Sequence, residues 1–129
     1  MSKTYKPEGY SSVSVYIVTE GAQRVIDFLK QTFGATQLRR FENPDGKIMH
    51  AEVRLDDTVV MIADAGGNYP PFPVWLHVYV EDVDKTYQKA LQAGGTSVQA
   101  PVRKEGDPDK RGGVKDPGGN TWWIATQVS

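Results

Sequence analysis

Three side chains suited to acid–base chemistry or metal binding lie in two strand-like segments. His50 and Glu52 alternate with apolar residues in the segment HAEVR, and His77 lies in the segment VWLHVYV. Imidazole and carboxylate together are typical ligands of Zn, Mn, Fe or Ni ions, and histidine is a general acid or base near neutral pH. These three are therefore the candidate catalytic residues, and their convergence would predict one divalent metal ion. The alternative is that they orient a bound molecule by hydrogen bonds.

Aromatic residues accompany these groups on strand-like segments: Tyr16, Trp75, Tyr79 and Trp123. Stacking on aromatic rings contributes about 0.5–1.5 kcal/mol per pair beyond the burial of area. The rings therefore predict a site for a planar or partly apolar molecule, since binding pockets are mostly apolar with a few convergent polar groups. Arg111 could bind an anionic group of that molecule bidentately. The competing interpretation is that the rings only fill space.

Composition excludes several classes of function. The chain has 129 residues and a formal net charge of -1, whereas binding of nucleic acid requires a basic excess or stripe. No segment reaches the roughly 20 apolar residues of a membrane helix, and the polar start, residues 1–10, resembles neither a signal peptide nor a transit peptide. The chain contains no cysteine, which removes disulfides and thiolate sites. We expect a cytoplasmic protein with no nucleic-acid or membrane partner.

A weak internal repeat predicts the elements that position the candidate side chains. In each half, a strand-like segment (12–19, then 74–80) precedes an amphipathic helical pattern. Gly34 favours a left-handed end for the first helix, and Asp82 is suited to cap the second. Three further strands follow each helix: 37–42, 47–55 and 58–64, then 97–103, 112–115 and 121–128. We therefore predict one domain, residues 1–129, with unit one at about 12–64, a linker at 65–73 and unit two at about 74–128.

Strand alternation separates the residues that face the helices from those on the opposite, concave face. The helix-facing residues are expected to be Val13, Val15 and Ile17 in the first strand and Val74, Leu76, Val78 and Val80 in the fifth. The concave face is expected to carry Ser14, Tyr16 and Val18, then Trp75, His77 and Tyr79. Because no helix covers this face, two units side by side would enclose a ligand cup.

The same segments resemble the vicinal oxygen chelate superfamily of glyoxalases, bleomycin resistance proteins and dioxygenases, in its PhnB-like branch. The resemblance spans nearly the whole chain, in segments 7–10, 13–18, 26–28, 33–35, 44–52, 76–84 and 111–126. It implies an α+β fold in which two βαβββ units form a curled, mostly antiparallel eight-stranded sheet with helices outside. It also implies a homodimer, since relatives commonly pair and exposed sheet edges need covering.

The resemblance further implies a divalent metal held by four inward side chains, usually His and Glu. Those positions fall here on Ser14, Ile62, Trp75 and Trp123. Serine is a poor ligand, while isoleucine and tryptophan cannot coordinate a metal. We therefore expect no metal at these positions and no cofactor, the alternative being one divalent ion at His50, Glu52 and His77.

The function that follows is metal-independent binding and sequestration of a small molecule, similar to that of bleomycin-type resistance proteins. The expected ligand-binding residues are Ser14, Tyr16, His50, Glu52, Ile62, Trp75, His77, Tyr79, Arg111 and Trp123. One alternative is a lyase, isomerase or dioxygenase of the same superfamily that uses a relocated metal site. Another is a degenerate member that serves only in interactions.

Overall fold

The computed structural model describes residues 5–129, so residues 1–4 of the predicted domain lie outside the described residues. The first half comprises β1 (Tyr16–Thr19), α1 (Ala22–Phe33), β2 (Thr36–Glu42), β3 (Ile48–Leu55) and β4 (Thr58–Asp64). The second half comprises β5 (Trp75–Tyr79), α2 (Val83–Gln92), β6 (Thr96–Arg103), β7 (Asp109–Lys115) and β8 (Thr121–Gln127). The prediction of two βαβββ units is confirmed.

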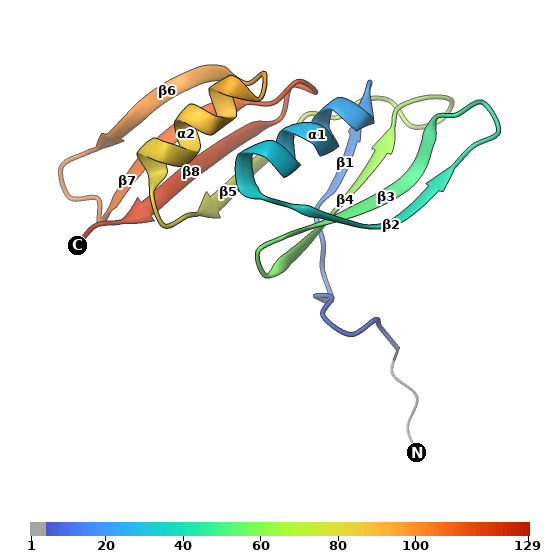
Figure 1. The fold of residues 1–129 in the computed structure, drawn as a ribbon, viewed down its shortest axis with the longest axis horizontal. Coiled ribbons are helices and arrows are strands. Elements are labelled where there is room, and N and C mark those ends of the chain that lie inside the picture. The colour runs from blue at the N-terminus through green and yellow to red at the C-terminus, as the bar shows by residue number, and fades with distance from the viewer. Residues whose placement is uncertain (1–4) are drawn as a thin grey trace.

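The eight strands form two four-stranded sheets, one in each unit, as Figure 1 shows. Their orders are β1-β4-β3-β2 and β5-β8-β7-β6, so the first strand of each unit pairs with the last. That pairing is parallel, whereas the other ladders are antiparallel. The sheets are therefore mixed and mostly antiparallel, and each repeats the topology of the other.

Helix α1 ends and helix α2 begins where the sequence predicts. Gly34 adopts the left-handed conformation (φ 69°) after α1, where its lack of a Cβ removes the steric penalty. The Asp82 side chain accepts a hydrogen bond from the backbone N–H of Lys85 and so caps α2. No helix among residues 5–129 is both long and apolar enough to cross a membrane.

A single hydrophobic core joins the two units. The helices lie next to each other on the same side of the two sheets in Figure 1. Phe33 of α1 packs against Trp122 of β8, with ring centroids 5.3 Å apart. Phe28 lies so near Gly95 that a Cβ at that position would meet its ring at 3.0 Å. Helix α1 is thus part of the interior of unit two as well as of its own unit.

Two strand boundaries differ from the prediction by more than one residue. Strand β1 begins at Tyr16 rather than Ser12, and Val13, predicted to face the helix, is 85% exposed. Strand β7 begins at Asp109 rather than Gly112, because the charged residues before the glycines pair with one another within the sheet. The strand therefore includes Asp109, Lys110 and Arg111.

Candidate functional site

The concave face of unit one carries a row of side chains in register. Met61 of β4 pairs with Tyr16 of β1 on one side and with Glu52 of β3 on the other, so these three residues share one face of the sheet. The neighbouring row, which includes Ile17 and Ile62, points to the helix and is fully buried. The strand parity assigned to Tyr16 is therefore confirmed, and Glu52 lies on the same face.

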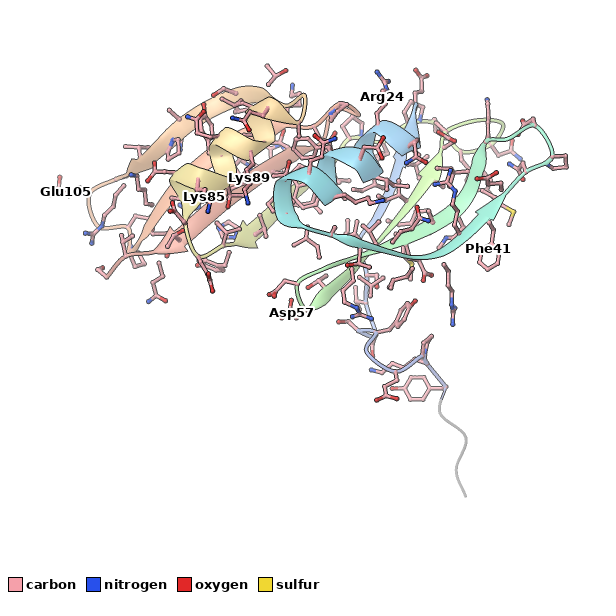
Figure 2. The ribbon with its side chains drawn as sticks, viewed as in Figure 1. Arg24, Phe41, Asp57, Lys85, Lys89 and Glu105 are labelled. Atoms are coloured by element: carbon pink, nitrogen blue, oxygen red, sulfur yellow. The ribbon has the colours of Figure 1, made fainter. Side chains whose placement is uncertain are left out.

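A chain of hydrogen bonds connects four side chains on this face. The Tyr10 hydroxyl donates to Oε1 of Glu52 at 2.5 Å, and Oε2 of Glu52 lies 2.8 Å from Nε2 of His50. On the other side of the imidazole, Nδ1 of His50 lies 2.8 Å from the Tyr16 hydroxyl. Phe41 of the outer strand β2, labelled in Figure 2, lies nearly parallel to the His50 ring, with centroids 6.3 Å apart. His50 is thus held from three sides.

The carboxyl group of Glu52 keeps its charge in a buried position, with 2% of the residue exposed. Burial by itself raises its pKa, but the hydrogen bonds from Tyr10 and His50 outweigh that effect, so the pKa of Glu52 lies below its ordinary value. Burial, followed by the charge of Glu52, raises the pKa of the Tyr16 hydroxyl. The Tyr16 side chain also borders a groove of about 750 Å³ whose wall includes Met49 and Tyr69.

The lowered pKa of Glu52 predicts a loss of stability in acid. The unfolded chain takes up a proton near pH 4.5, whereas the folded chain does so at a lower pH. The free energy of unfolding is therefore expected to fall as the pH decreases from about 4.5 through the folded pKa. In the Glu52→Gln variant this part of the pH dependence should be absent. Urea unfolding at a series of pH values measures it, and equal slopes in both proteins would contradict it.

The concave face of unit two is aromatic. Trp75, His77 and Tyr79 of β5 are exposed on it, and Trp123 of β8 is in register with His77. The rings of Trp75 and Trp123 meet edge to face, with centroids 5.3 Å apart. Gly113 lies opposite Trp123, and a Cβ there would approach the indole to 2.7 Å. The glycine therefore allows the Trp123 ring to lie flat against β7.

Arg111 is central to the polar part of this face, but it is already paired. Its Nε donates to Nε2 of His77 at 3.1 Å, and its two terminal nitrogens donate to Asp107 at 2.7 Å and Asp109 at 2.9 Å. The Tyr79 hydroxyl donates to the same Asp109 carboxylate at 2.7 Å. This guanidinium is therefore already paired with two carboxylates, and its bidentate contact with an anionic guest stays a prediction.

The environment of His77 favours its neutral form. Burial first, and then the positive charge of Arg111, lower the pKa of His77 below its ordinary value. His77 and Tyr79 also border a small pocket of about 300 Å³ together with the β3–β4 hairpin, whose tip is marked by Asp57 in Figure 2.

The assignment of Ile62 to the concave face is wrong. Ile62 is fully buried in the core, and its neighbour Met61 points into the cup. The repeat explains the error: Tyr16 pairs with Met61 in unit one as His77 pairs with Trp123 in unit two. The four positions at which the resemblance implies metal ligands are therefore occupied by Ser14, Met61, Trp75 and Trp123. This set does not fit a divalent ion.

The structure brings His50 and Glu52 together but leaves His77 apart. His50 and Glu52 hydrogen-bond to each other and to Tyr16 and Tyr10 in the first half of the chain, whereas His77 hydrogen-bonds to Arg111 in unit two. Within residues 5–129, no group of three or more His, Cys, Asp or Glu side chains could hold a metal ion. The convergence of these three residues within one chain is not observed.

Several residues of both faces were missed by sequence reasoning: Tyr10, Phe41, Met61, Asp107 and Asp109. The spacing of Asp107, Asp109 and Arg111, every second residue, was an available signal of one strand face. Tyr10 gave no such signal, because it lies before β1 outside any periodic segment.

Comparison with known sequences identifies similar proteins. The family model of the Glyoxalase/Bleomycin resistance protein/Dioxygenase superfamily matches residues 12–124. The uncharacterized protein Mb0911c of Mycobacterium bovis is 35% identical over 128 residues, covering 91% of this chain and 84% of its own. The uncharacterized protein Rv0887c of Mycobacterium tuberculosis is also 35% identical, covering 91% of this chain and 75% of its own.

Solved structures show the same fold. TioX from Micromonospora sp. ML1 superposes with a TM-score of 0.76 at 25% identity, covering 91% of this chain and 98% of its own. The PhnB protein from Bacillus cereus, described as a putative 3-demethylubiquinone-9 3-methyltransferase, has a TM-score of 0.71 at 19% identity. That match covers 90% of this chain and 99% of the Bacillus chain.

Proposed function

Because the chain belongs to the glyoxalase/bleomycin resistance protein/dioxygenase superfamily, we propose that it binds and sequesters a small planar molecule without a metal ion. The observation that carries this proposal is the aromatic surface of the concave face in unit two. Trp75 is 75% exposed there and meets the half-buried Trp123, and the exposed Tyr79 lies on the same face next to His77. Exposed aromatic clusters of this kind are typical of binding sites rather than of monomer surfaces.

The polar groups around these rings are suited to orientation of a guest. Each of His50, His77 and Tyr79 is fixed by a hydrogen bond to a charged side chain. Such fixed groups reduce the entropy that a ligand must overcome on binding. Aromatic antibiotics belong to the class of guest that such a face accommodates.

The cup is proposed to close in a homodimer. Within one chain, the groove beside Tyr16 and the pocket beside His77 have no lining residue in common. A second copy would cover the exposed aromatic side chains of both faces and place unit one of one chain opposite unit two of the other. Sedimentation equilibrium tests this proposal, since a monomer at micromolar concentration would contradict it.

Titration calorimetry with 2-naphthol and 2-methoxynaphthalene tests the binding function. These probes are planar, aromatic and differ only at one oxygen. We expect saturable binding of one or both near one molecule per chain, with each probe recovered unchanged. If the protein binds neither probe, the proposal is contradicted. If it converts a probe into a product, the protein is an enzyme.

Metal removal is expected to leave the protein unchanged. A specific ion at a hundredfold excess over its dissociation constant would stabilise the fold by about 2.7 kcal/mol. Because the donors at the family positions do not fit a metal, we expect chelator treatment and added Ni, Mn, Zn or Fe(II) to leave the melting temperature constant. Elemental analysis and thermal melts measure this. One ion per chain, lost in both His50→Ala and His77→Ala, would instead support the metal-dependent enzyme.

A further inference from the structure

The two histidines of the chain are hydrogen-bonded by partners of opposite kind. Nε2 of His50 faces the Glu52 carboxylate, whereas Nε2 of His77 faces Nε of Arg111. An ionised carboxylate only accepts hydrogen bonds, and a guanidinium only donates them. The same ring nitrogen must therefore be protonated in His50 and unprotonated in His77.

The tautomer of His50 determines the role of Tyr16. A neutral imidazole with a proton on Nε2 has a lone pair on Nδ1. The Tyr16 hydroxyl, 2.8 Å from Nδ1, therefore donates its proton to His50. The Tyr16 oxygen then has only lone pairs left, and Tyr16, which is 44% exposed as a residue, borders the groove in which a ligand would lie. This oxygen is a hydrogen-bond acceptor.

Tyr10 and Glu52 keep the direction of the His50 hydrogen bonds fixed. Tyr10 donates to Oε1 of Glu52, so both carboxylate oxygens accept hydrogen bonds. Rotation of the carboxyl group by half a turn only exchanges its two equivalent oxygens, so the ionised Glu52, 2% exposed, presents an acceptor to His50 in either orientation. An unmade hydrogen bond of a buried charged group is costly.

His77 has the opposite polarity. Because its Nε2 accepts from Arg111, the neutral ring carries its proton on Nδ1, which is a donor. Asp107 and Asp109 hold Arg111 in place on its other two nitrogens. Charged partners thus set both tautomers, one for each concave face.

We propose that Tyr16 and His77 select the guest by hydrogen-bond polarity. The guest presents an O–H or N–H donor to the Tyr16 oxygen and an acceptor, such as a carbonyl oxygen or ring nitrogen, to the His77 Nδ1–H. The ligand class is therefore a planar aromatic molecule with a donor at one edge and an acceptor at another. This inference specifies the ligand of the proposed binding function. It rests on that function and on the proposed homodimer, in which unit one of one chain, with Tyr16, lies opposite unit two of the other, with His77.

Nitrogen-15 NMR of the ligand-free protein at neutral pH tests the tautomers directly. The chain has two histidines, and His50→Gln and His77→Gln assign their signals. We expect His50 protonated at Nε2 only and His77 protonated at Nδ1 only, each serving as a reference for the other. The same tautomer in both residues, or a doubly protonated His50, would overturn the inference.

The paired probes test the selection itself. Because 2-naphthol carries an O–H that 2-methoxynaphthalene lacks, we expect it to bind about tenfold more tightly, the effect of one good hydrogen bond. Tyr16→Phe should abolish this preference, whereas Tyr69→Phe, which removes another phenol bordering the same groove, should retain it. Glu52→Gln should weaken or reverse it, since its amide can donate to His50.

Each outcome separates the inference from the proposed function. Equal binding of both probes by the unmodified protein would overturn the selection at Tyr16 and leave the binding function standing. Retention of the preference in Tyr16→Phe would do the same. Binding of neither probe would overturn the binding function, and the inference with it.

Discussion

Replacement of Trp122 by alanine is expected to lower the free energy of unfolding by about 3–5 kcal/mol, the range for large aromatic side chains deleted from cores. Trp122 is 2% exposed and packs on Phe33 from the other unit. Its indole Nε1 also donates to the buried Asp116 at 2.9 Å, so the substitution removes a partner of that carboxylate. Urea or guanidinium unfolding followed by circular dichroism measures the change.

Two tryptophans provide matched controls in the same chain. Trp75 is exposed on the concave face, so Trp75→Ala should change the unfolding free energy little. Trp122→Phe, which keeps a ring in the core but loses the hydrogen bond to Asp116, should give an intermediate loss. Equal losses in Trp75→Ala and Trp122→Ala would contradict the assignment of Trp122 to the shared core.

The affinity for a ligand, unlike the unfolding free energy, should depend strongly on Trp75. Trp75→Ala is expected to weaken binding of 2-naphthol at least tenfold, because stacking and the burial of a large exposed ring both disappear. Titration calorimetry with the folded variant measures the affinity. Tyr5→Ala is the control, since Tyr5 is another highly solvent-exposed aromatic residue, in the N-terminal segment that extends away from the sheets in Figure 1. Unchanged affinity in Trp75→Ala would show that this face is not the binding surface.

Much of the fold was predictable because apolar periodicity and turn chemistry are local. Strand β5 alternates between core and concave residues as its sequence indicates, and Trp75, His77 and Tyr79 lie on the predicted face. The repeat of the pattern about sixty residues apart predicted two equivalent units. Glycine at the end of α1 and aspartate at the start of α2 marked the helix boundaries.

The site was less predictable because it depends on partners distant in sequence. Glu52 was expected to orient a guest, but it is buried behind His50 by Tyr10, a residue 42 positions away. Arg111 was expected to be available, but Asp107 and Asp109 occupy it. The shift from Ile62 to Met61 is an error of one residue, and in a strand one residue reverses the face.

The shared core also constrains how the chain folds during synthesis. In each unit the first strand pairs with the last, so neither sheet is complete until its whole length has left the ribosome. Unit one emerges first, yet the ring that covers its Phe33 comes from β8 near the end of the chain. Such long-range closure slows folding and leaves apolar surface exposed meanwhile. Nascent chains that stop before β8 should therefore depend most on chaperones.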